Sequence, residues 1–323
     1  MPSLKSHIAA LILRNTRKKA FASPEGMNAW IAQARLTETH RPPAKLSARV
    51  SVAERSVAGS PVYEVTPRRV TSRQRLVYLH GGAFVFEIGR FHWAIIAELA
   101  ERVGARVTVP IYPIAPEHGF DAIFGMPLEL YEEMLRDVPV EDIVMVGDSA
   151  GANMAVVLAM LGARRGLPPP GRHVLISPGL DMTLANPQVF QLERIDPWLG
   201  IPGGLEAVRH YARDIPRDDW RISPIYGDLT VLPKTLIFTG THEILYPDTV
   251  LFAEKAREAG VDVELVVEPG MFHDWPLLAQ IREAKRARNR IVAFLREAEF
   301  GVQPSPAETP RPRLGWLNTA PSA

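Results

Sequence analysis

A serine between two glycines, in GDSAG at 147–151, is the clearest chemical feature of the sequence. It follows the apolar run IVMV and precedes the helical pattern ANMAVVLAML. A serine in a sharp turn between a strand and a helix presents its hydroxyl group at the helix N-terminus, where developing negative charge is stabilised. The pattern therefore predicts Ser149 as a nucleophile. An ordinary turn with a capping serine is the alternative.

A second glycine-rich segment, HGGAF at 80–84, directly follows the apolar run RLVYL. Glycines in such a loop leave backbone N–H groups free to donate to an oxyanion. Together the two segments indicate acyl transfer, in which a hydroxyl group attacks a carbonyl carbon and nearby donors stabilise the negative oxygen. A plain glycine-rich turn is the alternative for this segment.

Three further segments share their pattern with a known family: YPIAPEH at 112–118, SPGLDMTLANP at 177–187 and EPGMFHDWP at 268–276. With GDSAG and HGGAF, they make the chain resemble the hormone-sensitive-lipase group of α/β-hydrolases, the microbial carboxylesterases with an HGGG loop. The resemblance covers about residues 60–299. It implies an α/β-hydrolase fold with a mostly parallel central sheet, helices on both faces and a helical cap. It also implies ester hydrolysis without a metal or organic cofactor.

The family places its nucleophile, acid and base in that order along the chain. Among the nine histidines, His242 and His273 leave room for this order after Ser149, and His273 takes the family's position in FHDW. We therefore expect His273 to be the base, with His80 holding the glycine-rich loop by hydrogen bonds. Activity is expected to rise as the imidazole loses its proton, near pH ~6–7.

The acid is expected just after the apolar run TLIFTG, in THEILYPD. Its role is to orient the imidazole and stabilise the positive charge of the base. Glu243 takes the place of the family's catalytic Asp, a departure because Glu is one methylene longer. Asp248 is the alternative acid, although it also suits the first turn of the next helix. Asp274 adjoins the base in sequence and is expected to point its side chain elsewhere.

The sequence HGGA replaces the family's HGGG, which leaves the N–H group of Ala83 in place. The expected oxyanion donors are the backbone N–H groups of Gly82, Ala83 and Ala150, with Gly81 shaping the turn. Each such donor typically lowers the barrier by ~3–4 kcal/mol. Asp148, beside the nucleophile, is expected to orient the turn or to meet a polar partner.

Short runs rich in β-branched residues alternate with longer amphipathic stretches, a pattern typical of a mostly parallel sheet covered by helices. Each chemical segment follows one of the short runs. Strands are predicted at 75–79, 105–110, 143–147, 173–177, 235–240 and 263–267. Helices are predicted at 91–103, 121–136, 150–163, 246–259 and 276–299.

Three regions interrupt this alternation and suggest a domain division. Residues 1–45 look mostly helical and are expected to form the N-terminal part of the cap. Residues 181–230 lack a clear strand and are expected to be a cap insertion. The catalytic domain is then 46–180 with 231–300, and residues 301–323, with five prolines, are expected to form a C-terminal tail.

The composition excludes several classes of protein. The chain has 323 residues, 46% hydrophobic and 23% charged, with a net charge of +1, so nothing in the bulk charge indicates a nucleic-acid partner. The absence of cysteine excludes disulfides, thiolate metal sites and cysteine nucleophiles. No apolar run reaches the ~18–20 residues of a membrane span.

The N-terminal segment is basic. Residues 1–22 carry five basic and no acidic side chains, and the apolar run HIAALIL precedes most of this charge. A secretion signal has the opposite order, so we predict a cytoplasmic location. We read the segment as a solvated amphipathic helix, with contact to a membrane surface or a partner as the alternative.

The substrate pocket is expected to be walled by apolar residues of the cap and the glycine-rich loop, although many cap residues form a core of their own. The loop is expected to contribute Phe84 and Phe86. The expected cap residues are Phe21, Met27, Trp30, Ile31, Phe190, Trp198, Leu199, Leu205, Val208 and Tyr211.

These observations together predict a serine carboxylesterase that acts on small esters with short or medium acyl chains, using water and an acyl-enzyme intermediate. A lactone hydrolase of the same fold is the main alternative, and an amidase or acyltransferase would carry the same residues. A non-catalytic ligand-binding relative is the alternative of another class. Dimers occur in this group, so a homodimer is a further expectation.

Overall fold

A central sheet of eight strands organises the chain, as described for residues 2–300 by a computed structural model. The strand order is β1-β2-β4-β3-β5-β6-β7-β8. Strand β2 runs antiparallel to β1 and β4, and all other neighbours are parallel. The strands are β1 (Val50–Val57), β2 (Ser60–Pro67), β3 (Arg75–Leu79), β4 (Arg106–Pro110), β5 (Ile143–Asp148), β6 (Arg172–Ile176), β7 (Lys234–Gly240) and β8 (Val263–Glu268).

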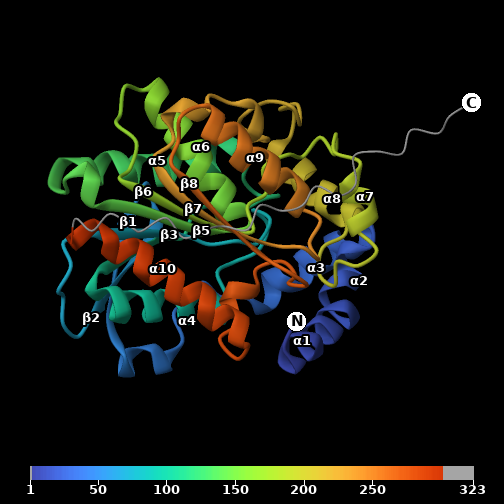
Figure 1. Cartoon of the computed structure of the whole chain (residues 1–323), viewed down its shortest axis with the longest axis horizontal. Coiled ribbons are helices and arrows are strands. Elements are labelled where there is room, and N and C mark those ends of the chain that lie inside the picture. Colours follow the sequence, from blue (N-terminus) through green and yellow to red (C-terminus); the bar gives the residue numbers. More distant parts are fainter. Residues whose placement is uncertain (1, 301–323) are drawn as a thin grey trace, which may run out of the picture.

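Helices cover both faces of the sheet, with α4 and α10 on one side and α5, α6 and α9 on the other (Figure 1). They are α1 (Leu4–Asn15), α2 (Arg17–Phe21), α3 (Pro24–Thr37), α4 (Arg90–Leu99), α5 (Phe120–Asp137), α6 (Ala150–Arg164), α7 (Gln188–Leu192), α8 (Ile201–Ala212), α9 (Tyr246–Glu258) and α10 (Arg282–Phe300). In β5, Met145 packs toward the α5–α6 side while Val144 and Val146 pack toward the α4–α10 side. A strand buried on both faces must be apolar throughout, which explains its unbroken apolar run. The predicted mostly parallel sheet with helices on both faces is confirmed.

Two elements differ from the sequence prediction. The hairpin of β1 and β2 was not predicted, because apolar and polar residues are mixed in the edge strand β1, of which only Val50 is buried. Its two-residue turn has positive φ at Ala58 (49°) and Gly59 (78°), a geometry that fits the twist of a hairpin. The helix predicted from residue 276 begins at Arg282 instead, because a short 3-10 turn containing Pro276 comes first.

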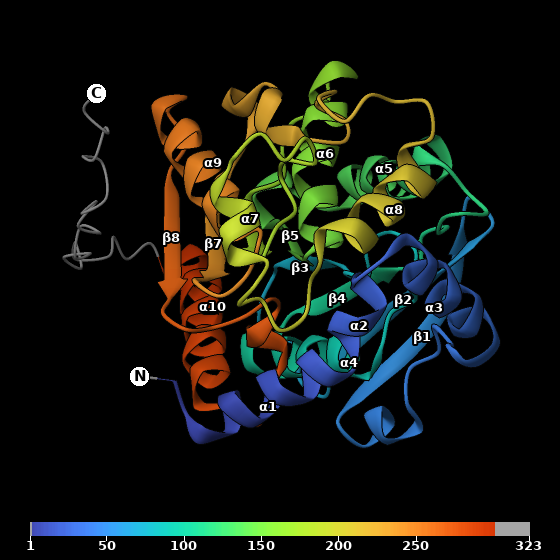
Figure 2. The same ribbon diagram turned by 90° about the vertical axis from the view of Figure 1, so that its right-hand side faces the viewer.

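Five helices from two distant segments lie together over the carboxyl ends of the parallel strands (Figure 2). We call α1, α2, α3, α7 and α8 the cap helices. Asn28 of α3 donates to Glu206 of α8 (Nδ2 to Oε1, 2.7 Å), and α2 and α3 both pack on α8. Four of the cap helices, α2, α3, α7 and α8, share one apolar cluster with the sheet. The predicted domain bounds therefore remain a prediction, and the predicted tail at 301–323 lies outside the described residues.

Arg35 of α3 ties the cap helices to the glycine-rich loop. Its guanidinium donates to the carbonyl oxygen of Val85 at 2.8 Å and pairs with Glu117 at 2.8 Å. Among residues 2–300, none of the helices has both the length and the apolar content needed to span a bilayer.

Helix α6 begins in direct contact with the ends of β3 and β5. A Cβ atom added to Gly151 would lie 1.9 Å from the carbonyl oxygen of Leu79, and one added to Gly147 would lie 2.5 Å from the backbone of Gly151. Real Cβ atoms do not approach backbone atoms this closely, so any larger residue would push the helix away from the sheet.

The change Gly151→Ala is therefore expected to lower the free energy of unfolding by about 2 kcal/mol or more, because overpacking forces the backbone to move. Urea unfolding followed by circular dichroism measures this change. Gly125→Ala is the matched control, since Gly125 lies in α5 with no atom within 4 Å of an added Cβ. The control should be neutral or stabilising by up to ~1 kcal/mol, and an equal loss in both variants would contradict the packing argument.

Candidate active site

Side chains from three loops meet at the carboxyl ends of β5, β7 and β8. The Nε2 atom of His273 lies 2.9 Å from the hydroxyl oxygen of Ser149, and its Nδ1 atom lies 2.9 Å from Oε2 of Glu243. His273 and Glu243 are both buried. In this arrangement a hydroxyl proton can pass to an imidazole whose orientation is held by a carboxylate.

The alternatives left open by the sequence take other positions. His242 is exposed, and its backbone N–H donates to Met271 at 2.8 Å. Asp248 lies in the first turn of α9, where burial and the charge of Asp181 raise the pKa of its carboxyl to about 6. The structure thus brings Glu243, and not Asp248, to His273.

Glu243 is held by three donors on its other oxygen. Its Oε1 atom accepts from Thr239 Oγ1 at 2.7 Å, from the N–H of Gly240 at 2.8 Å and from Ser177 Oγ at 3.1 Å. These bonds compensate for the loss of water around a buried carboxylate. They also leave Oε2 facing the imidazole.

Ser149 occupies a strained turn between β5 and α6. Its φ of 51° and ψ of −115° lie in a region that residues with a Cβ rarely adopt. The turn is fixed by a hydrogen bond of 2.8 Å from the N–H of Ser149 to the carbonyl oxygen of Ile176. The backbone thereby lifts the hydroxyl group above the sheet edge.

The glycine-rich loop has three consecutive residues with positive φ: Gly82 (123°), Ala83 (54°) and Phe84 (61°). Within residues 2–300, the N–H groups of Gly82, Ala83 and Ala150 have no hydrogen-bond acceptor, and all three residues line the cavity that contains Ser149. The N–H of Gly81 is different, because it donates to Asp148 at 2.9 Å. Three unpaired donors beside a hydroxyl group are suited to stabilising a negative oxygen.

The buried carboxylate of Asp148 joins this loop to the serine turn. It accepts from Tyr78 Oη at 2.7 Å, from Gly81 N and from His92 Nε2 at 3.1 Å. The N–H of Gly89 donates to His92 Nδ1 at 2.8 Å, so Nε2 carries the proton. Burial acts to raise the pKa of Asp148, but His92 and the hydrogen bond from Tyr78 outweigh burial and lower that pKa. No motif in the sequence marked His92.

His80 supports the loop from behind. Its Nδ1 atom lies 2.7 Å from the carbonyl oxygen of Gly81, and its ring stacks on Tyr112 with centroids 4.3 Å apart. Burial lowers the pKa of His80 to about 4, so the imidazole stays neutral. The hydrogen bond is of the kind expected from the sequence.

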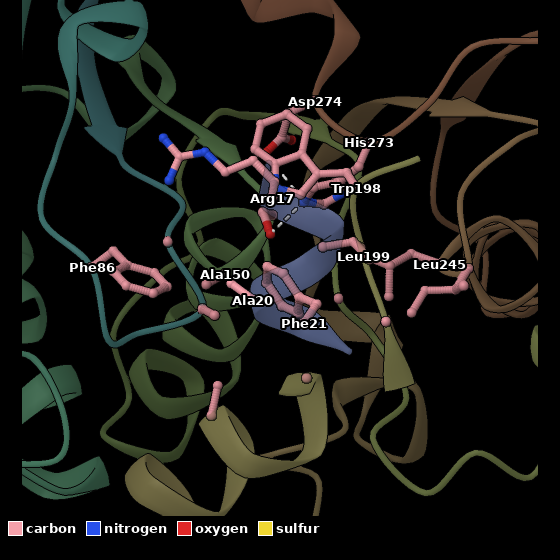
Figure 3. A pocket seen from close by; sticks show the side chains of 18 of the residues that line it. Arg17, Ala20, Phe21, Phe86, Ala150, Trp198, Leu199, Leu245, His273 and Asp274 are labelled. Atoms are coloured by element: carbon pink, nitrogen blue, oxygen red, sulfur yellow. Dashed lines mark hydrogen bonds and ion pairs between the residues drawn. The ribbon is translucent and has the colours of Figure 1, made fainter. Parts of the chain in front are cut away.

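A cavity of about 830 Å³ lies between the serine turn and the cap helices (Figure 3). Most side chains expected to wall the pocket line it: Phe21, Trp30, Phe84, Phe86, Trp198, Leu199, Leu205, Val208 and Tyr211. Met27 and Ile31 do not, because they are buried in the apolar core beneath the cap helices. Phe190 does not either, because it is 52% exposed on α7. No cluster of three or more acidic or histidine side chains in residues 2–300 is arranged to bind a metal ion.

Comparison with known proteins places this site in a family. A family model described as "alpha/beta hydrolase fold" matches residues 76–277. The chain is also 33% identical over 229 residues to an esterase of Acinetobacter venetianus, a match covering 70% of this chain and 76% of the relative. The solved structure of an esterase from the bacterial hormone-sensitive lipase family matches with a TM-score of 0.78 and 25% identity, covering 92% of this chain and 99% of that one. The chain belongs to the hormone-sensitive-lipase group of α/β-hydrolases.

A third relative matches over nearly the whole length. Carboxylesterase NlhH of Mycobacterium tuberculosis is 30% identical over 312 residues, covering 89% of this chain and 94% of the relative. A match of this extent includes the sheet and the helices α7 and α8, which lie in the middle of the chain.

Asp196 is a buried residue of this α/β-hydrolase that the sequence analysis missed. Its carboxyl accepts from the N–H groups of Trp198 (2.7 Å), Leu199 (2.9 Å) and Ile244 (2.9 Å). Burial raises the pKa of Asp196 to about 6, against the effect of these backbone hydrogen bonds. The carboxyl joins the segment between α7 and α8 to the loop that carries Glu243. It also places Trp198 edge-on to the His273 ring, with centroids 5.5 Å apart (Figure 3).

Asp274 corrects an expectation from the sequence, because its side chain turns back toward the imidazole. Its backbone is left-handed (φ 53°, ψ 26°), and Oδ2 lies 3.2 Å from the same His273 Nε2 that faces Ser149. A carboxylate facing this nitrogen favours the protonated ring. Burial acts to lower the pKa of His273, but Asp274 and Glu243 raise it overall to about 9.

The pKa of Asp274 is raised as well, first by burial and further by the negative charges of Asp148 and Glu243, with His273 opposing. The two groups are in contact and titrate as a pair. His273 and Asp274 therefore retain their last proton to a higher pH than a lone imidazole would. The contacts of His273 therefore favour a midpoint above the pH of ~6–7 expected from the sequence.

We predict that kcat/KM for an ester rises with pH up to about 9, because only the neutral imidazole can accept the serine proton. The change Asp274→Asn removes the negative charge and should move the midpoint toward the ordinary imidazole value of about 6.5. A pH profile of both proteins measures this. The same midpoint in both would show that Asp274 does not hold the proton.

Proposed function

We propose that this chain is a serine carboxylesterase that hydrolyses small esters with short or medium acyl chains through an acyl-enzyme intermediate. Its family and its esterase relatives establish the coarser class, a carboxylic ester hydrolase. The finer proposal is supported by the hydrogen bonds from Ser149 to His273 and on to Glu243, at the wall of a largely apolar cavity.

In the proposed mechanism, Ser149 Oγ attacks the ester carbonyl carbon while His273 Nε2 accepts the hydroxyl proton. The carbonyl oxygen becomes negative and accepts hydrogen bonds from the backbone N–H groups of Gly82, Ala83 and Ala150. His273 then donates its proton to the leaving alcohol, which departs as the acyl-enzyme forms. Water enters, loses a proton to His273, and releases the acid from Ser149 by the same route.

The alternatives use the same groups and differ in what fills the cavity. A lactone, an amide or an alcohol acceptor in place of water would meet the same serine and donors. A non-catalytic ligand-binding relative would keep the cavity without turnover, and a burst of alcohol from an activated ester separates it from all enzymes. A cytoplasmic location and a homodimer remain predictions.

Changes at Ser149 and Glu243 should reduce kcat far more than a change at the neighbouring carboxyl of Asp248. Ser149→Ala should lower kcat about 10⁶-fold, and Glu243→Gln should lower it roughly 10³–10⁴-fold by leaving the imidazole in the wrong tautomer. Asp248→Asn is the control, with a far smaller loss because Asp248 does not contact His273. A larger loss for Asp248→Asn than for Glu243→Gln would refute the acid assignment.

The acyl-chain preference is tested with p-nitrophenyl esters of increasing chain length. We expect turnover of the acetate and butyrate and a decline for long chains, as binding energy stops increasing once the apolar lining is filled. Steady kcat/KM measurements across the series check this, with Ser149→Ala as the blank. Turnover that rises without limit to long chains would contradict the short-chain proposal and leave the esterase class intact.

A further inference from the structure

The solvent-exposed face of α1 is apolar, whereas the exposed face of an ordinary surface helix is polar. Four side chains spaced at helical intervals are exposed: Leu4 (75%), Ile8 (50%), Leu11 (62%) and Ile12 (57%). At 100° per residue they span one stripe about 100° wide. A helix on a soluble surface normally turns polar residues to water, so this stripe lacks a partner among the described residues.

The opposite face of α1 is the one that packs on the protein, and both ends are fixed. Ala9 and Leu13 pack against the apolar cluster of α4 and α10. At the start, the backbone and hydroxyl of Ser3 donate to the carboxylate of Glu283 at 2.7 and 2.8 Å. At the end, Arg14 donates to the carbonyl oxygen of Ile195 at 3.0 Å. The helix cannot rotate to bury the stripe without breaking these contacts.

Basic side chains flank the stripe. Lys5 and His7 lie on its two sides, and Arg14 and Lys19 follow toward α2, all of them exposed. Residues 1–22 contain no acidic side chain. An apolar stripe with basic flanks matches an anionic lipid surface, whose acyl region accepts the stripe and whose head groups pair with the flanks.

The stripe adjoins the cavity. Ile12 belongs to both, and Ala9, Leu13 and Thr16 of the same segment line the cavity from inside. Figure 2 shows α1 along one edge of the molecule, between α10 and α2. We propose that the outward face of α1 docks on an anionic lipid surface, holding the cavity wall against the layer in which poorly soluble esters dissolve.

A second copy of this chain is the other occupant that the stripe would accept, and two features disfavour it. The helix is about 18 Å long, whereas a stable dimer buries about 800 Å² per partner. Two copies packed through this face would also bring their basic flanks together. Neither objection applies to an anionic lipid surface.

The experiment is flotation of the full chain with vesicles of ether-linked lipids, which contain no ester to hydrolyse. One set is phosphatidylcholine alone and the other contains 30 mol% phosphatidylglycerol. The triple variant Leu4→Gln, Ile8→Gln, Leu11→Gln removes the stripe but leaves the cavity lining intact. The matched control replaces three apolar residues exposed elsewhere: Leu36→Gln, Val70→Gln and Leu251→Gln.

We expect the wild type to bind the anionic vesicles more strongly than the neutral ones and to release them as salt increases. The stripe variant should bind at least tenfold less, and the control variant should bind like the wild type. Lys5→Gln and Lys19→Gln should each reduce binding to anionic vesicles about fivefold. Turnover of soluble p-nitrophenyl acetate should be unchanged in all of them, which separates lipid docking from the esterase proposal.

Three results would overturn the inference. The first is that the wild type binds neither vesicle set, and the second is that the stripe and control variants bind equally well. The third is a wild-type dimer, seen by light scattering, that the stripe variant loses while vesicle binding is absent, which would assign the face to a second copy.

Discussion

The contact between the start of α6 and the ends of β3 and β5 constrains every other group in the site. Gly147 and Gly151 allow the backbone of α6 to lie so close to the carbonyl oxygen of Leu79 that no side chain fits between them. The turn between strand and helix must then be short, and Ser149 takes a strained conformation to complete it. The hydroxyl group, the N–H of Ala150 and the Asp148 carboxylate acquire their positions from this one approach.

Buried charge is the second feature that organises the site. The carboxyl groups of Asp148, Glu243 and Asp274 are all buried close together. They differ in the number of hydrogen bonds that each accepts. Asp148 and Glu243 each accept three hydrogen bonds or more, whereas Oδ1 of Asp274 has no partner among the described residues. Asp274 is therefore the carboxyl least able to stay ionised, and its proton is the one shared with His273.

The sequence predicted the elements whose signals are local. The six parallel strands have short runs rich in β-branched residues, and the segments around Ser149 and His273 have family patterns, so both were predicted from the sequence alone. The hairpin of β1 and β2 was missed because an exposed edge strand need not be apolar. The Asp274 side chain points toward His273 because its backbone is left-handed, a conformation that the residue type does not predict. The contacts of Asp196 and His92 link residues 48 and 56 positions apart, and neither residue lies in a motif.

The hydrogen bonds of Asp196 limit how this enzyme could be rebuilt. The segment between α7 and α8 is joined through one carboxyl group to the N–H of Ile244, the residue next to Glu243. A foreign segment grafted in its place would have to bring an acceptor to the same point. Without one, the loop of Glu243 would lose its outer support even if the new segment folded well. The replaceable unit in this protein is thus the cap segment together with the loop it holds, and shuffling of caps between relatives should succeed only when both are exchanged.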